Sequence, residues 1–113
     1  MKRRIACLAA IAILGLLAAC TPTQVKPYSD SMFYGNCIMP FGPDPCDSDM
    51  EICQTFQDVF KTDYADVEAC RAACNKIFID QGNKYLGRNC FYMLDHGGNL
   101  CEQQCNRLYP KQK

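Results

Sequence analysis

Two stretches in the middle of the chain carry apolar side chains every three or four residues, which is the period of an amphipathic helix. The first predicted helix begins at Ser48, where Ser48 and Glu51 have the spacing of a capping box, and it ends at Lys61. The second begins near Asp66 or at Asp63, and three alanines in its first turns favour the helical state. A mainly α fold follows from these two stretches.

The end of the second helix and the start of the last one depend on glycines. Gly82 is expected to stop the second helix in the left-handed conformation. Lys84–Asp95 fits either a short helix or a strand, and we favour a helix because no partner strand is evident. His96–Gly98 is expected to form a turn, followed by a last helix from Asn99 to just before Pro110.

Proline organises the region before the first helix. Met39–Pro45 contains three prolines and a glycine, a density that excludes a helix or a central strand. We expect this segment to be an irregular loop between Cys37 and Cys46. The predicted fold class is therefore mainly α, a small bundle of three or four short helices that is crosslinked by disulfides and preceded by a Pro-rich N-terminal loop.

The N-terminus has the layout of an export signal. Met1–Arg4 is basic, and Ile5–Ala19 follows with 15 uncharged residues before Cys20. A bilayer-spanning helix needs about 20 apolar residues, so this run is too short to be one.

Leu17, Ala18, Ala19 and Cys20 resemble the lipobox of bacterial lipoproteins. The resemblance implies that residues 1–19 are removed, that Cys20 is lipidated, and that the membrane is a partner through that lipid. Thr21, in place of the Asp that retains enteric lipoproteins at the inner membrane, resembles the class that is sorted to the outer membrane. The expected localisation is thus the bacterial cell envelope, with the outer membrane favoured over the inner one.

Cleavage changes the charge and the domain boundaries. The whole chain has 12 basic and 12 acidic residues, and removal of residues 1–19 leaves 9 basic ones. An acidic mature chain argues against nucleic acid as a partner. Residues 20–33 are polar, contain two prolines and are expected to form a flexible tether. The disulfide-rich helical domain is expected to span residues 34–113.

Ten cysteines remain to be assigned. Cys7 leaves with the signal, and Cys20 carries the lipid. The even number that is left in an exported chain predicts disulfides. The eight candidates are Cys37, Cys46, Cys53, Cys70, Cys74, Cys90, Cys101 and Cys105.

Two of the predicted disulfides follow from paired Cys-x3-Cys spacings. Residues four apart lie on one helix face, and two antiparallel helices would pair Cys70 with Cys105 and Cys74 with Cys101. The arrangement resembles the twin Cys-x3-Cys helical hairpins of small secreted and intermembrane-space proteins, which implies this geometry and no activity.

The other four cysteines allow three pairings. Among these we favour Cys53 with Cys90, and Cys37 with Cys46 around the proline loop.

Chemical motifs are scarce in the rest of the chain. A Cys-x-x-Cys redox motif and a haem-attachment motif are absent, and both cysteine pairs lie on helical patterns rather than on zinc knuckles. We therefore expect no metal and no cofactor. His96 is the only histidine, and we expect it to be a solvated turn residue rather than a catalyst. We predict that the protein is not an enzyme.

Interaction is the remaining class of function. Eight aromatic residues could fill the core or form a docking patch. They are Phe33, Tyr34, Phe41, Tyr64, Tyr85, Phe91, Tyr92 and Tyr109. The sequence predicts a structural or protein-interaction lipoprotein of the cell envelope with an unidentified envelope protein as partner. The alternative is a lipid-anchored inhibitor or ligand-binding head that displays the Pro-rich loop.

Overall fold

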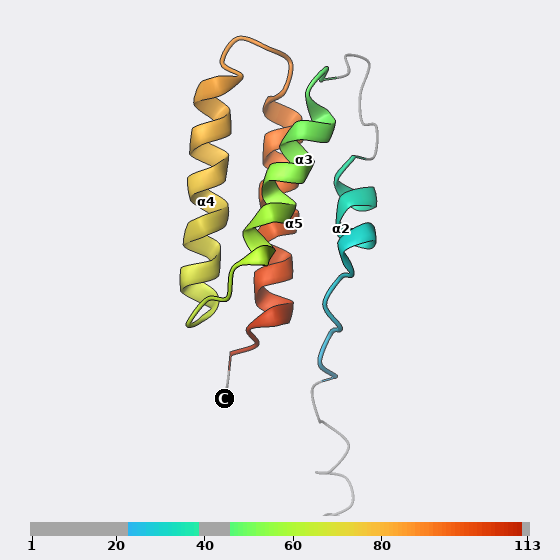
Figure 1. The fold of residues 1–113 in the computed structure, drawn as a ribbon, viewed down its shortest axis with the longest axis vertical. Helices are drawn as coiled ribbons and strands as arrows, with labels where there is room; N and C mark the ends of the chain where they lie inside the picture. The colour runs from blue at the N-terminus through green and yellow to red at the C-terminus, as the bar shows by residue number, and fades with distance from the viewer. Residues whose placement is uncertain (1–22, 39–45, 112–113) are drawn as a thin grey trace, which may run out of the picture.

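The computed structural model describes residues 23–38 and 46–111. These residues form an all-α domain, as the helical periodicity predicts, and Figure 1 shows the elements in chain order. They are α2 (Asp30–Cys37), α3 (Asp49–Asp58), the short 3₁₀ helix η1 (Val59–Lys61), α4 (Val67–Lys84) and α5 (Phe91–Leu108).

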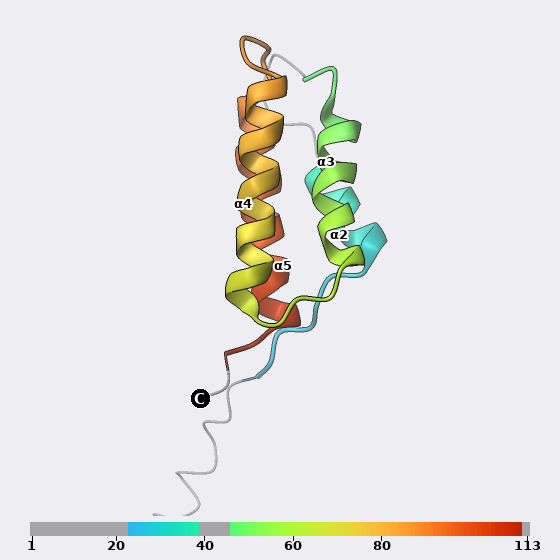
Figure 2. The same cartoon turned by 60° about the vertical axis from the view of Figure 1, so that its left-hand side comes forward.

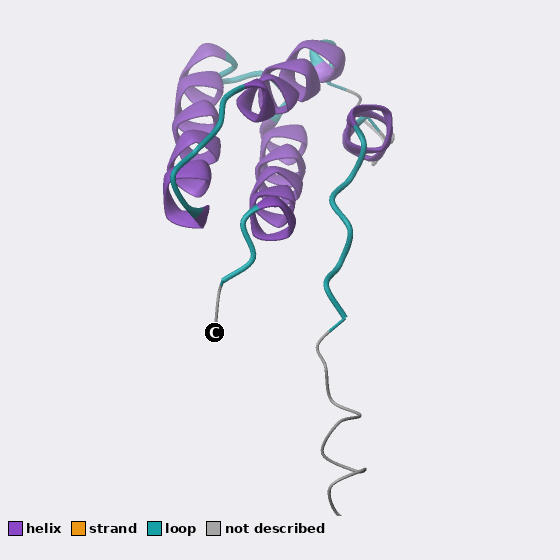
Figure 3. Cartoon of the chain, turned by 60° about the horizontal axis from the view of Figure 1, so that its bottom comes forward, coloured by secondary structure: helices purple, strands orange, loops and turns teal. Residues whose placement is uncertain are grey.

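The two longest helices, α4 and α5, form an antiparallel hairpin. Figure 2 shows α3 and α2 together on one side of this hairpin, and α5 contacts α2, α3 and α4. In Figure 3, α3 lies over one side of α5, and α2 lies on the side of α5 away from α4. The core lies between α5 and the α2–α3 pair, where Phe33, Ile52 and Phe56 are fully buried.

Helix α5 is continuous through His96–Gly98, so the turn and the separate last helix expected there are wrong. Packing against α3 explains the difference. A Cβ atom on Gly97 would lie 2.6 Å from Cδ2 of Phe56, closer than any tolerated contact. Glycine at this position therefore lets the Phe56 ring reach the α5 backbone, and this tertiary contact outweighs the low helix propensity of two successive glycines.

Helix α4 runs past Gly82 to Lys84, so the expected stop at Gly82 is also wrong. The helix begins as expected at the N-cap Asp66, whose Oδ1 accepts a hydrogen bond of 2.8 Å from Ala69 N–H. It continues because Tyr85 is buried at its end and donates its backbone N–H to the Gln81 carbonyl. Within the described residues, Gly87 takes the left-handed conformation instead, with φ +78°.

Ser48 occupies the N-cap of α3, but its side chain makes no capping hydrogen bond. Glu51 does not complete the expected capping box, because its carboxylate pairs with Lys84 at the end of α4. The helix is followed by η1, which ends at Lys61 as the sequence predicts.

Helix α2 begins within residues 20–33, where a flexible tether was expected, so that expectation is wrong for the described end of the segment. The side chain of Ser29 caps this helix by accepting a hydrogen bond from Met32 N–H, and Phe33 is only 1% exposed. The ring of Phe33 packs edge-on against Phe60 at 5.1 Å. The folded domain therefore begins before residue 34, because Phe33 is part of the core that holds α2 against α3.

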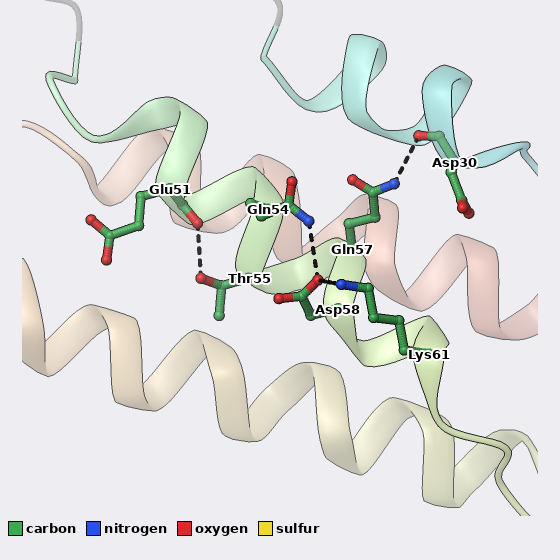
Figure 4. A network of polar contacts seen from close by, with 7 residues as sticks. All are labelled: Asp30, Glu51, Gln54, Thr55, Gln57, Asp58 and Lys61. Atoms are coloured by element: carbon green, nitrogen blue, oxygen red, sulfur yellow. Dashed lines mark hydrogen bonds and ion pairs between the residues drawn. The ribbon is translucent and has the colours of Figure 1, made fainter.

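Polar contacts line the exposed side of α3 (Figure 4). Gln57 donates to the backbone carbonyl of Asp30 at 3.3 Å and links α3 to α2. Asp58 accepts from Gln54 at 3.0 Å and pairs with Lys61 at 2.6 Å. The Asp58 contacts lie at the surface within α3 and η1, so each contributes little to the free energy of unfolding, and only the Gln57 bond joins α3 to another helix.

Candidate functional site

Two disulfides join α4 to α5 at successive helical turns. Cys70 pairs with Cys105 and Cys74 with Cys101, with Cα–Cα distances of 5.7 and 5.8 Å. All four sulfur-bearing side chains are buried. The antiparallel pairing expected from the two Cys-x3-Cys spacings is confirmed.

The other two disulfides differ from the pairing that we favoured. Cys37 pairs with Cys53, and Cys46 pairs with Cys90. Cys37 ends α2, which packs on α3, the helix that carries Cys53. Cys46 lies in the turn before α3, and Cys90 directly precedes α5; the N-termini of these two helices lie at the same end of the domain (Figure 1).

The segment before α2 is bound to the last turns of α5. We call residues 26–28 the strap. The backbone N–H of Tyr28 donates to Gln104 Oε1 at 2.9 Å, and Gln104 Nε2 donates back to the Tyr28 carbonyl at 2.9 Å. Gln104 is 5% exposed, and these two bonds satisfy both ends of its buried amide.

Arg107 holds the strap from the next turn of α5. Its guanidinium lies 3.8 Å from the centre of the Tyr28 ring and donates to the Tyr28 hydroxyl at 2.9 Å. The same guanidinium donates to the carbonyl of Lys26 at 3.1 Å. Sequence reasoning missed this site, although Gln104 lies between Cys101 and Cys105 on the buried side of the predicted helix.

A groove runs along the face of the α4–α5 hairpin that α3 does not cover. We call it the outer groove, and its volume is about 180 Å³. The phenyl ring of Phe91 lies edge-on to that of Phe78 at 6.3 Å and adds an exposed aromatic surface next to it. The groove is lined by Cys74, Asn75, Phe78, Asp95, Gly98, Asn99 and Glu102.

The charge of the outer groove is negative. Asp95 and Glu102 supply two carboxylates, and the lining residues that the structure describes include no lysine or arginine. Asp95 Oδ2 accepts a hydrogen bond of 3.4 Å from Asn99 Nδ2. The groove thus combines carboxylates and amides with aromatic carbon.

An ion pair links α3 to the last turn of α4. The ammonium of Lys84 binds the carboxylate of Glu51 and, together with a weaker contribution from Tyr85, lowers the pKa of Glu51. The same contact raises the pKa of Lys84. Both side chains are about half exposed, so the pair joins α3 to the end of α4 without burying charge.

His96 is not the solvated turn residue that we expected. It lies on α5, is half-buried, and its Nε2–H donates to the backbone carbonyl of Asn36 at 2.9 Å. This contact ties α5 to α2. Across residues 23–38 and 46–111, histidine, cysteine and acidic side chains form no group of three that could hold a metal ion.

The aromatic residues divide between core and surface. Phe33 and Tyr85 are buried, whereas Phe91 is 70% and Tyr92 54% exposed at the start of α5. The half-buried members are Tyr34, Tyr64 and Tyr109. Phe41 lies outside the described residues.

Several expectations fall on parts of the chain that the structure does not describe. The signal at residues 1–19, the lipidation site Cys20 and the Pro-rich loop at residues 39–45 all lie outside the described ranges. In the part that is described, no helix is long and apolar enough to cross a membrane.

The four disulfides indicate an oxidising compartment outside the cytoplasm. Comparison of the chain with protein-family models, with curated proteins and with solved structures gives no match in any of the three. The described residues form an all-α domain whose helices are crosslinked by four disulfides.

Proposed function

We propose that this protein is a lipoprotein of the bacterial cell envelope, anchored through Cys20, whose disulfide-linked head binds another protein. The lipobox resemblance at Leu17–Cys20 supports the anchor, and the four disulfides support an extracytoplasmic location. Two or more acyl chains hold a protein on a bilayer stably, so the lipid on Cys20 is sufficient as an anchor.

The four disulfides carry this proposal, and the strap limits how far the head can lie from the lipid. Because the carbonyl of Lys26 is bonded to Arg107, the spacer between Cys20 and the strap consists of residues 21–25 only. Five residues reach about 18 Å at full extension. The spacer is much shorter than a tether that runs to residue 33, so the lipid holds the head close to the bilayer.

The strap also sets the orientation of the head. It is bound to the C-terminal turns of α5, an 18-residue helix about 27 Å long. The spacer cannot reach the other end of this helix. The α4–α5 turn lies at the end of the hairpin opposite the strap (Figure 1), so in the proposed arrangement it points away from the bilayer. Surfaces on α4 and α5 are thereby exposed to partners in the envelope.

The experiment that tests the anchor is the intact mass of the protein extracted from membranes of an expressing Gram-negative host, with and without reduction. We expect a chain that starts at Cys20, carries acyl groups, and gains eight hydrogens when its four disulfides are reduced. Cys20→Ala is the matched control and should abolish the acyl mass and membrane retention. A chain that retains residues 1–19, or one without acyl mass, would refute the proposal.

A further inference from the structure

The outer groove lies on the face of the α4–α5 hairpin that no other described element covers. Figure 2 shows α2 and α3 on one side of the hairpin and no described helix on the opposite side. Asn75, Asp95, Asn99 and Glu102 are exposed along the groove. The disulfides between α4 and α5 hold its two walls at a constant separation, so the surface is formed before any partner arrives.

The chemistry of the groove is arranged in two zones. Toward the α4–α5 turn, the Phe78–Phe91 pair offers aromatic carbon. Farther along α5, Asp95 and Glu102 are seven residues apart, which places them about 10 Å apart on the same face of the helix. The Cβ of a residue at position 98 would lie 3.5 Å from the Phe78 ring, so Gly98 leaves that ring accessible between Asp95 and Glu102.

We infer that the outer groove binds a cationic amphipathic helix of a partner protein. Lysine or arginine side chains two turns apart on that helix pair with Asp95 and Glu102, and an apolar side chain packs on Phe78 and Phe91. Charge complementarity selects this occupant, because the groove has two carboxylates and no basic lining residue among those described. Binding of a helix by its apolar face in a groove is a common mode of peptide recognition.

This inference rests on the proposed function, since it names the partner that the anchored head would meet. Two other occupants fit the groove less well. An anionic lipid surface would be repelled by Asp95 and Glu102. A second copy of this chain, docked groove to groove, would bring the same carboxylates together with no intervening base.

The test uses the full, disulfide-bonded chain purified in detergent and a fluorescein-labelled synthetic peptide as the probe. The peptide is an 18-residue amphipathic helix with lysines seven residues apart and leucines on the adjoining face, and binding is followed by fluorescence anisotropy. We expect saturable binding that weakens as salt is raised. Replacement of the peptide lysines by glutamate should remove the binding.

Variants locate the binding surface. The double variant Asp95→Asn/Glu102→Gln should raise the Kd at least 10-fold, whereas Asp47→Asn/Asp63→Asn removes the same charge from exposed positions outside the groove and should leave it unchanged. For the aromatic zone, Phe91→Ser should weaken binding, and its control Met50→Ser removes an exposed apolar side chain from α3 without effect.

Three results would overturn the inference. The first is the absence of saturable peptide binding, and the second is an equal loss of peptide binding in the groove variant and in its charge-matched control. The third is self-association, measured by sedimentation, or vesicle binding that Asp95→Asn/Glu102→Gln abolishes while peptide binding stays unchanged. The anchor is judged separately. A chain without acyl mass that still binds the peptide through the groove would refute the lipoprotein proposal and leave the groove assignment intact.

Discussion

Gln104 and Tyr28 exchange two hydrogen bonds of 2.9 Å each across 76 residues of sequence. One side-chain amide thereby satisfies both the N–H and the carbonyl of a single strap residue, as a neighbouring strand would in a sheet. Since the amide of Gln104 is buried, its loss leaves two backbone groups to find other partners.

Gln104→Ala should therefore release the strap. Each lost hydrogen bond contributes about 0.5–1.5 kcal/mol, so we expect the free energy of unfolding to fall by about 1–3 kcal/mol. Hydrogen exchange of the Tyr28 amide should accelerate more than that of core amides in α5. Gln103→Ala, one residue earlier and exposed, is the matched control. Equal exchange rates in the two variants would contradict the proposed role of Gln104.

Alanine substitutions at Gly97 and at Gly82 should change the free energy of unfolding in opposite directions, because only Gly97 contacts Phe56 closely. Gly97→Ala should lower the free energy of unfolding by about 1–3 kcal/mol, because its Cβ would lie 2.6 Å from the buried Phe56 ring. Gly82→Ala lies in α4 with nothing within 4 Å of the new Cβ and should raise that free energy by about 0.5–1 kcal/mol. Denaturant titration of both variants measures the two effects. Stabilisation by both alanines would show that the ring accommodates the methyl group.

The sequence predicted the elements whose signals are local. The i, i+4 spacing of Cys70 and Cys74, matched by Cys101 and Cys105, was enough to predict two disulfides because a helix places such residues on one face. Asp66 likewise marked the start of α4 through its own capping bond.

The misplaced features depend on contacts between distant residues. Helix α2 buries only Phe33 and Cys37, so its apolar pattern is too sparse to reveal a helix. Without that helix, the sequence favoured Cys90 as the partner of Cys53. The glycines of α5 look like a turn until the Phe56 ring is placed against Gly97. The outer groove is formed from two helices, and no single stretch of sequence contains it.

The two disulfides that differ from the favoured pairing should stabilise the domain to different extents. Cys46–Cys90 closes a loop of 44 residues and Cys37–Cys53 one of 16. Loop-closure entropy then predicts losses of about 4 and about 3 kcal/mol when each pair is replaced by alanine. Guanidinium denaturation of the two double variants tests the order. Mass mapping of the unreduced protein tests the pairing itself, and a peptide linking Cys53 to Cys90 would disprove it.

The Glu51–Lys84 pair should make stability depend on pH at both extremes. The pKa of Glu51 is lowered in the folded state, so the contribution of the pair is present above the unfolded pKa of the carboxyl group and is lost as the pH falls through the folded value. The pKa of Lys84 is raised, so the contribution is present below the unfolded pKa of the amine and is lost as the pH rises through the folded one.

Glu51→Gln should accordingly be less stable than the parent at neutral pH and equal to it in strong acid. Denaturation of the parent, Glu51→Gln, Lys84→Gln and the double variant across pH forms a thermodynamic cycle. In the Lys84→Gln background, the effect of Glu51→Gln at neutral pH should shrink to the smaller contribution of Tyr85 and Arg88. An undiminished effect there would assign the pH dependence to another group.

The two disulfides between α4 and α5 have a mechanical consequence. A single bridge would let the helices pivot about it, whereas bridges at successive turns remove both pivoting and sliding. The hairpin therefore moves as one stiff lever. A force applied near its turn is transmitted along the helices to the strap, instead of being absorbed by movement of one helix against the other.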